Sequence, residues 1–148
     1  MQQTMRKIKR VQPLIKMKQT KVDEESAVLQ AIRREKVTVV TQMKENQRRY
    51  MEGVERMNHL RTSRTRDNLT TMEQAVDHVK AEWYRLYKRV QDIETKEKAQ
   101  IAQVLTAERD LKAVEKLQEK YQLEFRKEVS QSEQKQLDEI ALRNFTNS

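Results

Sequence analysis

Two histidines, His59 and His78, carry the side chains best suited to bind a metal or transfer a proton near neutral pH. No carboxylate stands at ligand spacing from both, and the chain has no cysteine, so two solvated histidines are a simpler interpretation than a metal site. The adjacent acids Glu24 and Glu25 would point to different faces of a helix and cannot flank one substrate. A single glycine leaves no phosphate-binding glycine loop. We therefore predict a protein that is not an enzyme and has no cofactor, metal or small-molecule substrate.

Basic side chains are concentrated at the start of the chain. Seven cations precede the first acid, Asp23, whereas the remaining residues hold 24 basic and 23 acidic groups. Such a cluster can neutralise nucleic-acid phosphates, anionic lipid or an acidic protein pore, or it can be a solvated charge run. Because no acid interrupts it, we expect an acidic partner. The seven cations are Arg6, Lys7, Lys9, Arg10, Lys16, Lys18 and Lys21.

The positions of these groups depend on a regular apolar stripe in each half of the chain. Counting alternately three and four residues from Leu69 to Phe125 gives seventeen positions, of which fourteen are apolar. The same count from Ile8 to Leu60 gives sixteen positions, of which eleven are apolar. A stripe this narrow is the seam of a coiled coil, and a lone helix cannot bury it. The chain is therefore predicted to be all-α, a long antiparallel two-helix coiled-coil hairpin.

The ends of the two predicted helices follow from proline and from a polar run. Pro13 fits best in the first turn of a helix, although a helix that runs through it with a kink is the alternative. The run from Arg61 to Asn68 lacks apolar residues and predicts a bend. The predicted segments are a basic N-terminal arm (1–13), a first helix (about 14–61), a bend (about 62–69) and a second helix (about 70–143), all within one domain (1–148).

Folding at the bend pairs residues whose numbers sum to about 132 or 133. Lys36 then lies opposite Glu97, so two polar interruptions of the seam meet with opposite charges, which selects the register. Gly53 falls opposite Val79, beside the bulkiest layer of the seam, where a missing side chain makes room. Chance is the alternative explanation, since a seam of this length has several polar layers.

In this register the second helix is longer than its partner. The first helix ends at about Ile8, opposite Phe125, and the second continues for some eighteen residues with polar residues at the seam positions. A different stripe remains there, formed by Val129, Leu137, Ile140 and Ala141. We expect this stripe to dock on another surface; a frayed helix end is the alternative.

Tyr84 and Tyr87 flank the seam residue Trp83 but stand outside the seam themselves. At least one of the two should therefore be exposed, and exposed aromatic side chains are favoured anchors for a partner protein. The alternative is that both rings lie flat along the coil and widen the seam.

The run from Glu133 to Phe145, EQKQLDEIALRNF, resembles the closing motif of the flagellar export protein family FliJ, whose relatives include the YscO-type proteins of injectisomes. The layout is similar as well, with a basic start, two long helices, a bend near the middle and no cysteine. The resemblance leaves open whether the system is a flagellum or a virulence-associated injectisome.

The resemblance implies a non-catalytic central stalk and adaptor of a type III secretion ATPase. Its paired chain ends would enter the hexameric ATPase ring, and other surfaces would bind the export gate membrane protein and export chaperones. This places it in the cytoplasm, at the periphery of the inner-membrane export apparatus. Pro13 departs from this layout, because it can prevent the first helix from continuing alongside the tail. The implied ring contacts are Arg6, Lys7, Lys9 and Arg10 on one helix and Lys135, Leu137, Asp138, Glu139 and Ile140 in the motif.

The gate or chaperone surface would lie nearer the bend, and we assign Tyr84 and Tyr87 to it from their expected exposure alone. The main alternative function is that of a basic coiled coil that binds nucleic acid or anionic membrane through residues 6–21. A nucleic-acid-binding protein would have no use for the closing motif. A mitochondrial factor is a third interpretation, but the start lacks the serine enrichment of a transit peptide. No apolar run approaches the roughly 18 residues of a membrane span.

Overall fold

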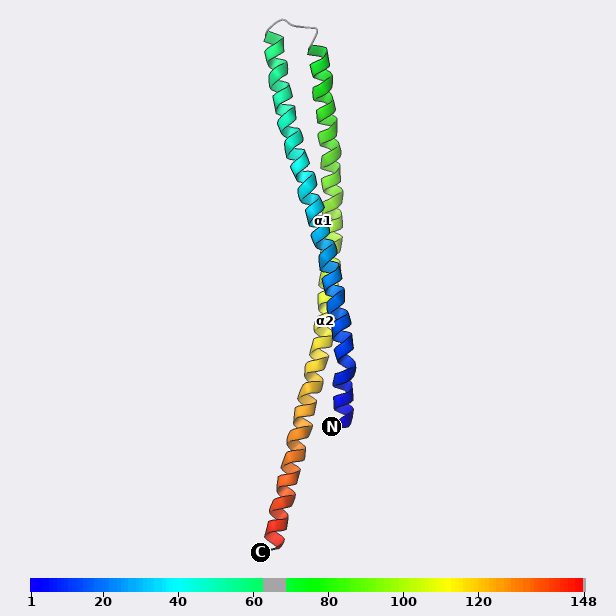
Figure 1. Cartoon of the computed structure of the whole chain (residues 1–148), viewed down its shortest axis with the longest axis vertical. Helices are drawn as coiled ribbons and strands as arrows, with labels where there is room; N and C mark the ends of the chain where they lie inside the picture. The colour runs from blue at the N-terminus through cyan, green and yellow to red at the C-terminus, as the bar shows by residue number, and fades with distance from the viewer. Residues whose placement is uncertain (63–68, 148) are drawn as a thin grey trace. The chain divides into compact units, whose positions relative to one another are not determined.

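The computed structural model describes residues 1–62 and 69–147, and almost all of them are helical (Figure 1). Helix α1 spans Gln2–Thr62 and helix α2 spans Leu69–Thr146, with no strand in the described residues. The two helices pack against each other in antiparallel orientation, which confirms the prediction of an all-α helical hairpin. Residues 63–68, which include most of the expected bend, lie outside the described residues.

Two compact units make up the chain. The terminal unit contains Met1–Glu25 and Gln103–Ser148, and the inner unit contains Ser26–Ala102. Each unit pairs one segment of α1 with one segment of α2. The single domain expected over residues 1–148 stays a prediction, because two compact units can still unfold as one. Neither described helix has a stretch long and apolar enough to cross a membrane.

The seam forms as the spacing predicts. Every position counted from Ile8 to Leu60 and from Leu69 to Phe125 is buried or half-buried. In the inner unit the most deeply buried cluster consists of Val39, Leu86 and Ile93, with Ile32, Met43 and Val90 packed against it. The cluster is small because two helices can bury only the strip between them.

The register of the inner unit agrees with the predicted sum. Lys36 Nζ lies 3.4 Å from Glu97 Oε1, and Arg33 Nε lies 3.6 Å from Glu97 Oε2, so the seam carboxylate is shared between two cations. Gly53 needs a correction, because a Cβ built on it would lie 2.9 Å from Cγ2 of Val76 rather than against Val79. A seam residue of a coiled coil packs between successive seam residues of the partner helix and not against a single one. This explains why Gly53 is nearest Val76 although Val79 was predicted.

The start of α1 differs from the prediction. The helix begins at Gln2 and contains Pro13 in its interior, so the N-terminal arm over residues 1–13 and the helix start at 14 are wrong, and the alternative of a helix running through Pro13 is correct. Proline removes one helical hydrogen bond. Seam burial of Ile8 and Val11 on its N-terminal side favours the helix despite that loss. At the other end, α2 continues to Thr146, three residues beyond the expected limit.

Candidate partner-binding surfaces

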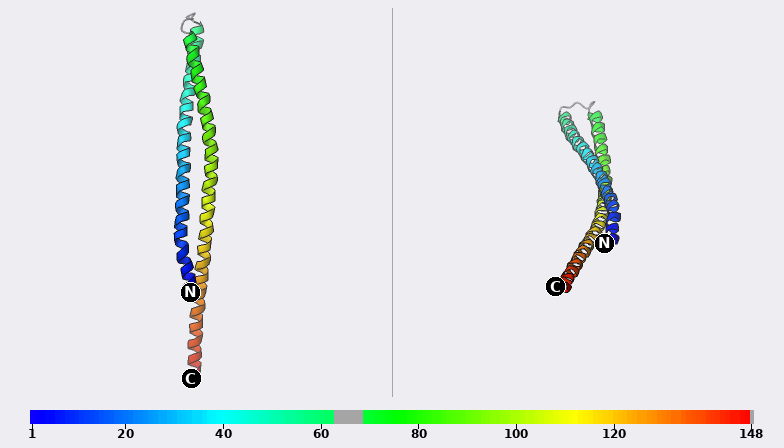
Figure 2. Two further views of the ribbon diagram at one scale, coloured as in Figure 1. Left: turned by 90° about the vertical axis from the view of Figure 1, so that its right-hand side faces the viewer. Right: turned by 60° about the horizontal axis from the view of Figure 1, so that its bottom comes forward.

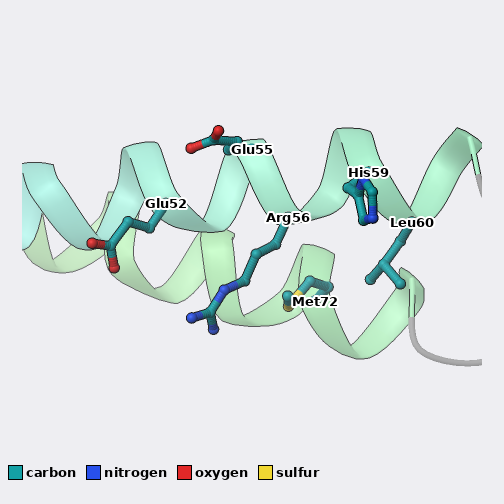
Figure 3. A pocket seen from close by; sticks show the side chains of 6 residues that line it. All are labelled: Glu52, Glu55, Arg56, His59, Leu60 and Met72. Atoms are coloured by element: carbon teal, nitrogen blue, oxygen red, sulfur yellow. The ribbon is translucent and has the colours of Figure 1, made fainter.

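One of the two histidines lies at a hollow of the inner unit. His59 lines an open hollow of about 450 Å³ together with Glu52, Glu55, Arg56, Leu60 and Met72, whereas His78 is not part of its lining (Figure 3). Figure 3 shows that Met72 comes from α2 and that the other five side chains come from α1. Among the described residues, no three His, Cys, Asp or Glu side chains are close enough together to hold a metal ion.

Aromatic rings gather on one side of the inner unit. Tyr84 and Tyr87 are 55% and 42% exposed, which confirms that at least one of them reaches the surface. Both rings contact Trp83 at centroid distances of 5.4 Å, Tyr84 edge to face and Tyr87 stacked. Both tyrosines are therefore exposed and in contact with the half-buried ring of Trp83.

A hollow that the sequence analysis missed lies beside these rings. It measures about 240 Å³ and is lined by Gln47, Tyr50, Lys80, Trp83 and Tyr84. Tyr50 and Trp83 are seam positions, so their periodicity marked them as core and gave no sign that they border a hollow. Nearby, Arg85 donates a hydrogen bond to Glu82 and holds the pKa of that carboxyl below its usual value. We call Tyr50, Trp83, Tyr84 and Tyr87 the aromatic surface.

The N-terminal cations lie on the terminal unit. Arg6, Lys7, Lys9 and Arg10 are all exposed, as a ring-binding surface requires. Lys7 is the one of these four with a described contact, since its ammonium lies 5.4 Å from the centroid of the Tyr121 ring and makes a cation–π interaction.

The closing motif extends past the start of α1 within the same unit (Figures 1 and 2). Its five predicted contact residues are all exposed. The amide of Gln134 donates a hydrogen bond to Asp138 Oδ1 at 3.1 Å, and Leu137 and Ile140 present apolar side chains to solvent. The residues concerned are Lys135, Leu137, Asp138, Glu139 and Ile140.

A polar contact that the sequence analysis did not find closes the seam where α1 begins. Thr4 is 4% exposed, and its hydroxyl donates a hydrogen bond of 2.8 Å to Glu128 Oε1. The amino group of Met1 lies 3.1 Å from the other oxygen of Glu128. The Thr4 hydroxyl, and then the amino group, lower the pKa of the Glu128 carboxyl. Seam pairing therefore reaches Glu128, one position beyond the expected last layer.

Two of the three predicted contact groups belong to the terminal unit. The N-terminal cations and the closing motif lie at the same end of the terminal unit, because Lys135 follows the paired Glu128 by two helical turns, about 10 Å at 1.5 Å per residue. The aromatic surface belongs to the inner unit.

Comparison with known proteins places these surfaces in a family context. The family described as "Flagellar FliJ protein" matches the chain over residues 7–148, nearly its whole length. No curated protein and no solved structure matches the chain.

Proposed function

This chain belongs to the FliJ family, and from that premise we propose that it is the non-catalytic central stalk and adaptor of a flagellar-type export ATPase. The family makes it a component related to flagellar or type III protein export. The proposal adds three partners: the hexameric secretion ATPase, the export gate membrane protein and the export chaperones. It also places the protein in the cytoplasm, at the periphery of the inner-membrane export apparatus.

The proposal is supported best by the arrangement of the two helices at the end of the terminal unit. There α1 contributes exposed cations, and α2 extends beyond the Thr4–Glu128 contact with exposed apolar residues. Because α1 continues through Pro13 to Gln2, a two-helix plug is compatible with this chain, and the objection raised by the proline falls away. Cations beside a protruding helix suit a ring whose inner wall is acidic and has apolar depressions.

The ring contacts divide by chemistry. Arg6, Lys7, Lys9 and Arg10 would pair with carboxylates of the ring, while Leu137 and Ile140 would supply the apolar anchors. Anchors of this kind, surrounded by polar groups, carry most of the energy of typical protein interfaces. Lys135, Asp138 and Glu139 would then form the polar rim of the contact.

The aromatic surface is proposed as the second binding site, for the gate protein or a chaperone. Tyr84 and Tyr87 are exposed yet held by Trp83, so binding would cost little side-chain entropy. The adjacent hollow bordered by Tyr50 offers room for one apolar side chain of the partner.

The test of the stalk role is stimulation of the purified hexameric export ATPase by the full chain. Leu137→Asp with Ile140→Asp should abolish co-purification and stimulation, because two charges would replace the apolar anchors. The matched control is Leu105→Asp with Leu123→Asp, which changes two exposed leucines of α2 outside the motif and should leave both readouts intact. Unchanged stimulation by the motif variant would refute the ring contact, and equal losses in both variants would refute the assignment to the motif.

A further inference from the structure

The seven N-terminal cations are not equivalent in the structure. Lys7 contacts the Tyr121 ring, Lys18 is half-buried in the seam, and Lys21 forms a 3.0 Å ion pair with Glu25. The side chains of the other four are exposed and form no ion pair or hydrogen bond with a described residue. They are Arg6, Lys9, Arg10 and Lys16, and we call them the cationic face.

Helical geometry places these four side chains on one side of α1. At 3.6 residues per turn, positions 6, 9, 10 and 16 lie within about 60° of the direction opposite the buried positions Val11 and Ile15. No acid occurs on the helix before Asp23. The cationic face therefore extends over about three turns of helix without an acidic residue on the same stretch of α1.

We propose that the cationic face binds the surface of a membrane rich in anionic lipid. Binding is peripheral and electrostatic, because the apolar side of α1 is sealed against α2 and cannot insert. Each Lys or Arg near an anionic leaflet contributes about fivefold in affinity. Arg6, Lys9 and Arg10 are also the cations proposed to contact the ATPase ring, so these side chains would bind one partner at a time. The inference itself does not depend on the proposed function, because it concerns the chain without the ATPase.

Two features favour lipid over nucleic acid as the partner. Met17 is exposed on the same side of the helix, next to Lys16, and a thioether can enter the headgroup region beside the cations but gains nothing from phosphates in solution. The cationic face carries no aromatic side chain, so unpaired bases have no platform on which to stack.

The second helix of the same unit offers a matched control. Lys112, Lys116, Lys120 and Lys127 are also exposed, but each has a glutamate three or four residues away along α2. Changing these four to glutamine removes the same charge from the same unit without touching the cationic face.

The experiment is sedimentation of the full chain with vesicles of phosphatidylcholine, with and without phosphatidylglycerol, at low salt and at 300 mM salt. We expect binding only to the anionic vesicles and its loss at high salt, since screening weakens surface charge interactions. The variant Arg6→Gln, Lys9→Gln, Arg10→Gln, Lys16→Gln should bind several hundredfold more weakly, and the α2 variant should keep most of the affinity. Circular dichroism verifies that both variants remain helical.

Three results would overturn the inference. The first is absence of binding to anionic vesicles at low salt, and the second is an equal loss in the two variants, which would make net charge the cause. The third is tighter binding to a DNA duplex than to the vesicles under the same conditions, which would identify nucleic acid as the partner. No ATPase is present in this assay, so its failure is distinct from failure of the stalk proposal.

Discussion

The inner and terminal units are built on the same seam but use it differently. In the seam of the inner unit, Val39 and Ile93 are 2% exposed and Glu97 is shared between Lys36 and Arg33. In the terminal unit, six of the seven N-terminal cations and the apolar residues of the closing motif remain exposed. The difference teaches that stability should be concentrated in the inner unit and charge-dependent binding in the terminal unit.

The largest expected effect compares one substitution in the two units. Val39→Ala should lower the free energy of unfolding by about 2 to 3 kcal/mol, because it removes two buried carbons and leaves a cavity in the core cluster. Val11→Ala, at a position 6% exposed in the terminal unit, should cost only about 1 kcal/mol, since the seam there can close around the gap. Urea unfolding followed by circular dichroism measures both. Equal losses would remove the comparison, and two separate transitions would show that the units are independent domains.

Replacing a buried polar residue of the inner unit should raise, and not lower, the free energy of unfolding. Asn46 is buried in the seam, and its Oδ1 accepts no hydrogen bond from the described residues. Asn46→Leu should therefore raise the free energy of unfolding by about 1 to 2 kcal/mol, because an unsatisfied buried polar group is costly. The control is Gln42→Leu, on the exposed side of the same helix, which should leave the melting temperature unchanged. A destabilised Asn46→Leu variant would show that the amide has a partner in solution.

Substitution of Gly53 should change the stability less, and the sign of the change should depend on the residue at position 76. Gly53→Ala gains about 1 kcal/mol of helix propensity, but its Cβ would lie 2.9 Å from Val76, a stiff β-branched side chain, so we expect a net loss of about 1 kcal/mol. In a Val76→Ala background the clash disappears and the same change should stabilise by about 1 kcal/mol. Thermal melts of the four proteins in this cycle decide the matter; additive effects would mean that the contact is absent.

The seam and its register were predictable because a 3-4 spacing is a property of neighbouring residues along the chain. The pairing of Lys36 with Glu97 followed from one number, the sum set by the bend. The helix start was not predictable in the same way, since it depended on whether burial of Ile8 and Val11 outweighs the defect at Pro13. The local preference of proline gave the wrong result, and tertiary packing decided the start.

The candidate surfaces were predicted less completely, also for physical reasons. Exposure of Tyr84 and Tyr87 followed from their positions beside the seam, but the hollow next to Trp83 depends on how far apart the helices lie. In the sequence of α2 alone, Glu128 is a polar residue at a seam position and gives no sign of a partner. Its partner Thr4 is polar too and stands outside the counted stripe, so only the three-dimensional pairing revealed the contact.

The smallest expected effect concerns that contact and is a pH dependence confined to the terminal unit. The pKa of Glu128 is lowered in the folded chain, first by the Thr4 hydroxyl and then by the amino group of Met1. A lowered folded-state pKa means that the contact is fully stabilising above the ordinary value of about 4.3 and is lost as pH falls through the folded-state pKa. Amide hydrogen exchange in the first turns of α1 should therefore be protected at pH 6 and faster than the intrinsic rate change predicts below about pH 4.

Glu128→Gln isolates the charge in that measurement. The amide can still accept the hydrogen bond from Thr4, but it cannot titrate, so protection should be weaker at pH 6 and independent of pH in the acid range. The inner unit supplies the internal control, because residues around Val39 should keep their protection over the same pH range in both proteins. Acid-dependent loss of protection that persists in Glu128→Gln would assign the effect to other carboxylates. The comparison would then have to be drawn between the total charges of the two units and not between one polar layer and an apolar core.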